Sequence, residues 1–400
     1  MEAVRHLIYR MHPLRVSASL SLFLRDETIG GKLVIVAALL SLLVVNSPLQ
    51  NLFLDFWHQS LSIGFDTWRL DLSLKEWLNE GLMALFFLVV GLEIKREFMR
   101  GELRDHKTAI LPIGAAIGGV LLPAILYLDF TAHTNALQGW GIPIATDTAI
   151  AVAILSLLGD RVPIQLKIFL LALAVADDML AILVISLFYT GGVNLLFVGC
   201  SIFIIIMTYL FRSFLSTRLL MVIGLGILLW LTTHLSGVHA SIVGVVMGLL
   251  APISSKDKGV STPEKVERFF LPLTTLFVVP LFAIANAGFV MSPEPFATSS
   301  FIIVGIVSGL LFGKVTGITL MSWLLVRLRI AQLPDEVDWR HIIGVGFIAG
   351  VGFTMSLFIA ELAFPNSSSQ LDAAKIGIFL ASTISALVGL LILSSRRQES

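Results

Sequence analysis

Two adjacent aspartates stand in the middle of an apolar segment long enough to cross a membrane. The segment runs from Ile168 to Tyr189 and reads IFLLALAVADDMLAILVISLFY, with Asp177 and Asp178 as its only charged residues. At about 1.5 Å per helical residue, each end of the segment lies roughly 15 Å from the pair. One charge at the centre of a bilayer costs about 2.5–3.5 kcal/mol or more, and a second carboxylate beside it adds to that cost. The pair is therefore predicted to be a site for an ion or for protons.

Two further charges fall deep inside apolar segments. Asp147 lies in GWGIPIATDTAIAVAIL, and Lys314 lies in GIVSGLLFGKVTGITL, near the middle of its span. Three carboxylates and one ammonium group in such surroundings invite a salt bridge. A static ion pair that orders the helices is the alternative, but ionisable groups inside a membrane are functional by default. We therefore interpret these two residues as part of the same site.

The composition indicates a membrane protein with many helical spans. Of the 400 residues, 56% are hydrophobic and only 14% are charged, and the mean hydropathy is +0.93. A soluble domain carries about 25% charged residues. The long continuous apolar runs also exclude a porin-type barrel, in whose strands apolar and polar residues alternate. The net charge of zero favours no class of partner, and no nucleic acid is expected.

We interpret residues 1–400 as one transmembrane domain, in which windows of about 20 apolar residues predict twelve spans. Their ranges are 31–46, 78–98, 108–128, 142–158, 164–190, 193–211, 217–234, 237–252, 269–289, 300–326, 341–363 and 373–394. No small-residue cleavage site follows the first of them, so we expect an uncleaved first span. The single cysteine, Cys200, lies in an apolar run and is expected to be a buried, inert thiol.

The basic residues divide unequally between the two sides that these spans define. All but four of the 27 Lys and Arg residues fall on the side that carries both termini. The exceptions are Arg69, Lys75, Lys375 and, inside a span, Lys314. Because positive residues accumulate in cytoplasmic loops, both termini are predicted to be cytoplasmic.

Two of the spans carry helix-breaking residues at mid-membrane. In the fourth span, Pro143 removes a backbone donor shortly before the polar stretch Thr146-Asp147-Thr148, and the eleventh span contains the glycine-rich stretch GVGFIAGVGFTMSLF. We predict that both helices are interrupted; close helix packing through small residues is the alternative. Interrupted helices in corresponding positions of two halves are typical of a transporter site between half-helices. Spans 3–5 and 10–12 run in opposite directions, which matches an inverted repeat.

The first external loop, about residues 47–77, contains two short segments typical of strands. Ser62-Ile63-Gly64-Phe65 precedes the turn, and the alternating stretch from Trp68 to Leu74 follows it. We predict a small external β-hairpin, with an irregular interfacial loop as the alternative. An isolated hairpin is marginally stable, which favours a partner surface for it.

Charged clusters lie at the predicted cytoplasmic ends of the second and ninth spans. The first contains Glu93, Arg96 and Glu97, and the second contains Lys265 and Glu267. Solvated helix ends are the simpler interpretation of both clusters. Because the first cluster lies outside the apolar core, we expect it to influence when the ion site works and not to contact the ion.

Seven stretches of the chain together closely resemble the bacterial NhaA family of Na⁺(Li⁺)/H⁺ antiporters. They are NEGLMALFFLVVGLEIKREFMRGEL, IPIATDTAIAVAILSLLGDRVP, LKIFLLALAVADDMLAILVISLFYTGG, SGVHASIVGV, PLFAIANAGF, GLLFGKVTGI and GVGFTMSLFIAELAF. The resemblance covers spans two to twelve, and the DD pair, the TD dipeptide and the GK lysine make it specific. It implies an all-α fold of twelve helices in which the fourth and eleventh are discontinuous and cross, since this family is a known example of inverted-repeat transporters.

The resemblance also implies roles for the charges inside the membrane. Asp177 and Asp178 are expected to bind the cation and protons in alternation, and Lys314 is expected to pair with Asp177. Asp147, with Thr146 beside it, is expected to balance the half-helix dipoles at the crossing. Sodium is a hard cation that prefers such oxygen ligands.

Regulation and assembly follow from the same resemblance. The clusters at the ends of spans two and nine are expected to set activation at alkaline pH, although Arg268 stands where a histidine often occurs in the family. The implied activity is electrogenic exchange of cytoplasmic Na⁺ or Li⁺ for external protons in a bacterial inner membrane, without a cofactor. A homodimer formed through the hairpin is implied as well.

Three rival functions remain open at this stage. A solute-coupled transporter would need a roomier cavity at the midplane. A passive channel would not move sodium uphill. An intramembrane aspartyl protease also needs two aspartates, but on separate helices within YD and GxGD motifs, and neither motif is present.

Overall fold

Helices account for most of the chain that the computed structural model describes, which is residues 29–65, 68–215, 218–251 and 262–395. In the first half they are Ile29–Val45, α2 (Gln50–His58), α3 (Leu74–Glu76), α4 (Met83–Arg100), α5 (His106–Thr131), α6 (Thr148–Leu157), α7 (Ile164–Phe188) and α8 (Leu195–Leu210). In the second half they are α9 (Arg212–Leu215), α10 (Leu219–Leu235), α11 (Ile242–Leu250), α12 (Thr262–Leu273), α13 (Val279–Asn286), α14 (Glu294–Thr298), α15 (Ser300–Ser308), α16 (Lys314–Arg327), α17 (Trp339–Ala349), α18 (Phe353–Ala363) and α19 (Ser368–Ser394). Tighter or wider helical turns connect several of them: η1 (Trp77–Leu82), η2 (Glu102–Arg104), η3 (Leu137–Ile144), η4 (Gly159–Arg161), η5 (Thr274–Val278) and η6 (Gly309–Gly313).

Seven helices in the described part of the chain are long and apolar enough to cross a membrane, or nine if two bent helix pairs each count as one span. The bent pairs are Ile29–Val45 with α2, at 114°, and α17 with α18, at 46°. Each of the twelve predicted apolar segments coincides with one of the helices or helix pairs, and α8, α10 and α11 fall short of the spanning length. The predicted class, a helical protein with several membrane spans, is therefore confirmed.

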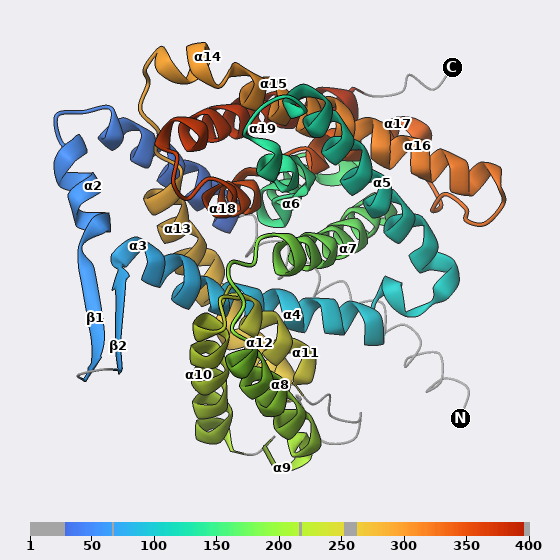
Figure 1. Ribbon diagram of the computed structural model, residues 1–400. Helices are drawn as coiled ribbons and strands as arrows, with labels where there is room; N and C mark the ends of the chain where they lie inside the picture. Colours follow the sequence, from blue (N-terminus) through green and yellow to red (C-terminus); the bar gives the residue numbers. More distant parts are fainter. Residues whose placement is uncertain (1–28, 66–67, 216–217, 252–261, 396–400) are drawn as a thin grey trace, which may run out of the picture.

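Helix α7, which carries the aspartate pair, lies at the centre of the bundle (Figure 1). It contacts α4, α5, α6 and α17, and most of its middle is buried, including both aspartates. An unbroken helix satisfies its own backbone groups, as a membrane requires. The helix thus supplies a rigid support for the two carboxylates.

Two pairs of helices touch backbone to backbone, and small residues make this possible. A Cβ atom placed on Gly118 of α5 would lie 2.2 Å from the carbonyl oxygen of Gly317 on α16. A Cβ atom on Gly244 of α11 would lie 1.9 Å from the carbonyl oxygen of Ala84 on α4. Contacts of this kind drive helix association in lipid, where the hydrophobic effect between helices is absent.

The predicted β-hairpin is confirmed. Strands β1 (Ser60–Phe65) and β2 (Trp68–Ser73) pair antiparallel, with Ile63 opposite Leu70. Gly64 has φ of 138°, a conformation that suits glycine. The indole N–H of Trp77 donates to the carbonyl of Leu61 over 2.9 Å and ties the hairpin to the bundle. The rest of the loop was not predicted to be helical, yet α2 forms there.

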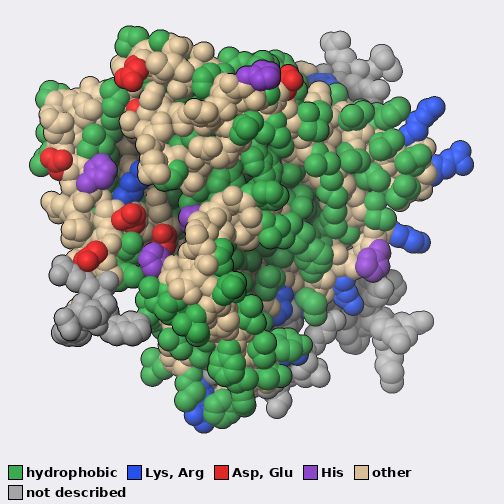
Figure 2. Space-filling model, viewed as in Figure 1, with side chains coloured by type: hydrophobic (Ala, Val, Ile, Leu, Met, Phe, Trp, Pro, Cys, Tyr) green, Lys and Arg blue, Asp and Glu red, His purple; other side chains and the backbone are tan. Residues whose placement is uncertain are grey.

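The outer surface shows large apolar areas with charges gathered towards the ends (Figure 2). On the face in view, most Lys and Arg side chains lie along the right and lower edges, and most Asp and Glu side chains lie at the left and top. Exposed apolar residues such as Phe203 and Ile227 cover α8 and α10. Cys200 is exposed on α8, so the expectation of a buried thiol is wrong. The reason is that α8 turns most of its apolar side chains outward.

Candidate ion-binding site

Both predicted helix interruptions are present, and they meet. The fourth span is broken at residues 145–147, between η3 and α6, and the eleventh at 350–352, between α17 and α18. The backbone N–H of Asp147 donates to the carbonyl of Val351 over 2.7 Å. A Cβ atom on Gly352 would lie 2.9 Å from the carbonyl oxygen of Ala145. The two breaks therefore cross in direct contact.

Some of the glycines in the eleventh span also serve close packing, the alternative interpretation of this stretch. A Cβ atom on Gly344 would lie 2.5 Å from the side chain of Leu393. One on Gly350, at the break itself, would lie 2.5 Å from the carbonyl oxygen of Leu310. Interruption and close packing thus occur together in this segment.

Asp147 satisfies two helix N-termini at once. Its Oδ1 accepts from the backbone N–H of Ile150 over 3.1 Å in the first turn of α6. Its Oδ2 accepts from the backbone N–H and the hydroxyl of Thr354, over 2.9 and 2.5 Å, in the first turn of α18. Helix N-termini carry a partial positive charge, so one buried carboxylate balances both. Thr354 was not among the predicted site residues, and only its place in the polar, glycine-rich stretch pointed to it.

Two donors satisfy the helix C-termini at the same crossing. The ammonium group of Lys314 donates to the carbonyl of Ile144, the last residue of η3. The hydroxyl of Thr146 donates to the carbonyl of Ala349, the last residue of α17, over 2.7 Å. A cation and a hydroxyl donor stabilise the negative ends of helices.

Lys314 also forms the expected ion pair with Asp177. Its Nζ lies 2.9 Å from Oδ1 and 2.7 Å from Oδ2 of that carboxylate. The side chains are only 1% and 2% exposed. A fully desolvated pair of this kind holds together because separating it leaves two buried charges without compensation.

Asp178, the next residue on α7, stands in different surroundings. Its side chain is buried, and its Oδ2 accepts from the hydroxyl of Thr148 over 3.2 Å. Within the described residues, no Lys or Arg nitrogen lies within ion-pair distance of Asp178. The two neighbouring carboxylates therefore differ, since Asp177 is bonded by an ammonium group and Asp178 by a neutral hydroxyl.

Of the predicted regulatory residues, Glu93 lies closer to this site than expected. Its side chain is 13% exposed, and its charge is close enough to Asp178 for the two to interact. It also lies 3.4 Å from Arg96. Glu93 is near enough to interact because α4 packs directly against α7. That the cluster does not contact the ion stays a prediction.

The rest of that cluster joins α4 to its neighbours. Glu97 accepts from the backbone N–H of Glu102 over 3.2 Å. Lys95, a neighbour of the cluster on α4, donates to the carbonyls of Leu249 and Ala251 at the end of α11. The simpler interpretation of a solvated helix end is therefore incomplete.

For the second cluster, the structure describes the helix but not the charged side chains. Helix α12, which carries Lys265, Glu267 and Arg268, packs against α4, so the two clusters lie on neighbouring helices. The side chains of these three residues lie outside what the structure describes.

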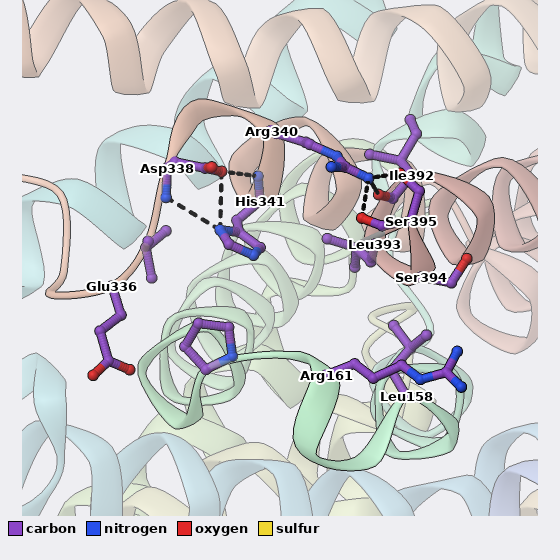
Figure 3. Close-up of a pocket in the computed structure, with 12 residues that line it drawn as sticks. Leu158, Arg161, Glu336, Asp338, Arg340, His341, Ile392, Leu393, Ser394 and Ser395 are labelled. Carbon is purple, nitrogen blue, oxygen red and sulfur yellow. Dashed lines mark hydrogen bonds and ion pairs between the residues drawn. The ribbon is translucent and has the colours of Figure 1, made fainter. Parts of the chain in front are cut away.

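A cavity of about 840 Å³ lies apart from the aspartate pair (Figure 3). It is lined by the connection between α6 and α7, the start of α17 and the end of α19. Arg340 on its wall donates to the carbonyls of Ile392 and Ser395, and His341 lies 2.9 Å from Asp338. Arg340 thus joins the start of α17 to the end of α19, while Asp338 and His341 cap the N-terminus of α17.

No resident metal centre is found in the described ranges, where His, Cys, Asp and Glu nowhere form a group of three or more suited to an ion. A cation at the aspartate pair would instead be held by carboxylate oxygens, with hydroxyl and carbonyl oxygens nearby. Hard cations accept such ligands.

Buried carboxylates at the crossing of two interrupted helices are the arrangement of an ion-coupled secondary transporter. The chain belongs to the Na⁺/H⁺ antiporter 1 family, whose model matches residues 21–393. It is 43% identical to the Na⁺/H⁺ antiporter NhaA of Proteus mirabilis, over 95% of this chain and 97% of that protein. It is 40% identical to the Na⁺/H⁺ antiporter NhaA of Pelagibacter ubique, over 93% and 96% of the two chains. The family expected from the motifs is therefore confirmed.

A solved structure supports the fold. The sodium proton antiporter MjNhaP1 from Methanocaldococcus jannaschii matches with a TM-score of 0.54, over 95% of this chain and 96% of that one. At 12% sequence identity, this likeness concerns the fold alone.

We expect Lys314→Ala to lower the melting temperature in detergent. Loss of the ammonium group leaves Asp177 as a buried charge without a partner, which costs about 3–5 kcal/mol. The double variant Lys314→Ala/Asp177→Asn should recover part of the loss, because it removes the stranded charge as well. Lys107→Ala, an exposed lysine, serves as the control. An unchanged melting temperature in Lys314→Ala would contradict a stabilising pair.

Proposed function

We propose that this protein exchanges cytoplasmic Na⁺, or Li⁺, for external protons at Asp177 and Asp178. The observation that carries the proposal is the difference between the two carboxylates: an ammonium group pairs with one, and no Lys or Arg among the described residues pairs with the other. Carboxylate oxygens that hold a sodium ion also accept protons, so the two cargoes compete for one site. Competition becomes exchange when the loaded site opens in turn to each side of the membrane.

Lys314 makes the proposed exchange electrogenic. As a cation settles between the two carboxylates, it competes with Lys314 for the oxygens of Asp177. Two carboxylates and a titratable ammonium group together release more than one proton for each sodium ion bound. The exchange is therefore electrogenic in this proposal.

The crossing is the element that alternates access. Each half of the chain has an intact helix, then a broken helix, then an intact helix. In the first half these are α5, η3–α6 and α7; in the second half they are α15–α16, α17–α18 and α19. Helix α5 packs on α16, so the first members of the two units are in contact. We propose that these units form an inverted repeat within twelve spans, and that half-helices at the crossing tilt between the two access states.

The charge distribution supports an orientation. In the predicted topology most Lys and Arg residues fall on the side of both termini. Figure 2 shows most of the Lys and Arg side chains in view along two edges of the molecule. We propose a bacterial inner-membrane location with both termini in the cytoplasm.

Asp178→Asn and Asp177→Asn are each expected to abolish cation-driven proton movement, because each removes a charge that the cation needs. The measurement is dequenching of a pH dye in everted vesicles on addition of Na⁺, Li⁺ or K⁺. Asp129→Asn, an exposed aspartate near the end of α5, is the control. Wild-type exchange in correctly inserted Asp178→Asn would refute the site, and a requirement for an organic solute would favour a solute-coupled transporter.

The charged ends of α4 and α12 are proposed to set the working pH. Glu97→Gln removes a charge from the last turns of α4 yet keeps an oxygen to accept from Glu102. A charge near a helix end contributes about 0.3–1 kcal/mol, and one pH unit corresponds to about 1.36 kcal/mol. We expect the activity profile to shift by up to about one unit, with the maximal rate within a few-fold of wild type. Vesicle assays from pH 6 to 9 test this, with Glu294→Gln, an exposed glutamate of α14, as the control. A lower rate with an unshifted profile would indicate a structural role.

The hairpin is proposed to hold a homodimer together. Leu61 and Ile63 are exposed on β1, well outside the apolar bundle. Deleting residues 62–66 is expected to weaken dimerisation and to leave exchange largely intact. Sedimentation of the purified protein in detergent gives the oligomeric state. Loss of exchange by a stable, inserted monomer would show that the hairpin serves transport directly.

A further inference from the structure

Thr148 is the first residue of α6, and its hydroxyl is the hydrogen-bond donor to Asp178. We infer that this hydroxyl is a ligand of the transported cation, shared with the Asp178 carboxylate. The inference rests on the proposed function, because it concerns the same ion. It adds a residue that sets cation affinity, with Na⁺ and Li⁺ as the ligand class.

The state of the two carboxylates indicates where a cation first binds. Both oxygens of Asp177 lie within 2.9 Å of the Lys314 ammonium group. Asp178 has no such partner among the described residues, and its Oδ2 is 3.2 Å from the Thr148 hydroxyl. An entering cation reaches Asp178 without first displacing the lysine, so the neighbours of Asp178 are its first ligands.

The chemistry of a hydroxyl group suits this position. A threonine hydroxyl donates one hydrogen bond and also carries two acceptor lone pairs. It donates to Asp178; on rotation of its O–H bond it offers a lone pair to a cation held by the same carboxylate. Carboxylate and hydroxyl oxygens are the hard ligands that such cations take.

The other threonines of the crossing are already committed. The Thr146 hydroxyl donates to the carbonyl of Ala349 over 2.7 Å, and the Thr354 hydroxyl donates to Asp147 over 2.5 Å. Both bonds hold helix ends together. Of these three, Thr148 is the one whose hydroxyl donates to Asp178, and its bond is the longest. The hydroxyl of Thr146 lies beside Asp177, the carboxylate that Lys314 already pairs with.

Accessibility and charge point to the same residue. Asp147, Asp177 and Asp178 are buried, whereas Thr148 is partly exposed. Glu93 adds negative charge close to Asp178. Thr148 thus stands at the accessible edge of the carboxylates, where local charge attracts a cation.

The test compares three single variants of the full-length protein in everted vesicles. Thr148→Val removes the hydroxyl and keeps the shape, Thr148→Ser keeps the hydroxyl, and Thr208→Val removes a hydroxyl of α8 that bonds within its own helix. Apparent KM values for Na⁺ and Li⁺ are measured beside the maximal rate, and melting temperatures report on folding. Thr148→Val is expected to raise both KM values about tenfold, with the maximal rate within a few-fold. Thr148→Ser and Thr208→Val are expected to stay near wild type.

Wild-type KM values for both ions in a folded Thr148→Val protein would overturn the inference while leaving the proposed function in place. A fall in maximal rate that Thr148→Ser shares, without a change in KM, would also overturn it, because that pattern belongs to a structural role. Absence of any cation-driven proton movement in the wild type would instead refute the proposed function. If Thr148→Val does not fold, Thr148→Ala takes its place, and calorimetric titration of the purified protein with Na⁺ measures the affinity. An affinity equal to that of the wild type would then overturn the inference.

Discussion

A backbone that leaves the helical conformation inside a membrane must find new partners for its N–H and C=O groups, and this constraint shapes the whole centre of the protein. Lipid offers no hydrogen bonds, so each unsatisfied group costs several kcal/mol. The chain meets the requirement by crossing two interrupted helices, so that each break supplies partners for the other. Asp147 serves both N-termini, and Lys314 and Thr146 serve the two C-termini.

The groups that satisfy the crossing lie beside the aspartate pair. Lys314 holds the end of η3 and a carboxylate of α7 at the same time. A cation that competes for Asp177 thus acts on a residue that also fixes a half-helix. In the proposed exchange, this ammonium group is where binding at the carboxylates is coupled to movement of the backbone.

Features that depend on local sequence could be predicted, and those that depend on distant contacts could not. A few neighbouring residues are enough to recognise the charges in apolar runs, Pro143 in the fourth span and the turn around Gly64. The partner of Lys75 does not: its Nζ lies 2.7 Å from Glu361, which also pairs with Lys375. Two of the exceptions to the charge asymmetry thus pair with the same carboxylate.

The same distinction explains the errors at the site. Thr354 bonds to Asp147 across 207 positions of sequence, and no periodicity reports such a pair. Glu93 lies at the end of an apolar run, which indicates its depth along the membrane normal but not its neighbour on another helix. The outward face of α8 at Cys200 likewise depends on which neighbours the helix has. Motif resemblance supplied the pairing of Lys314 with Asp177, which composition alone left open.

The crossing also has a consequence for biosynthesis. Thr146 and its acceptor on Ala349 are 203 residues apart. At about 5–20 residues per second, the ribosome needs roughly 10–40 s to make the second break after the first. During that interval the break around Asp147 lacks its partners Ala349, Val351 and Thr354, and the groups that they satisfy need water at the insertion machinery. The first half of the chain therefore enters the bilayer incomplete, and its full insertion waits for the second half.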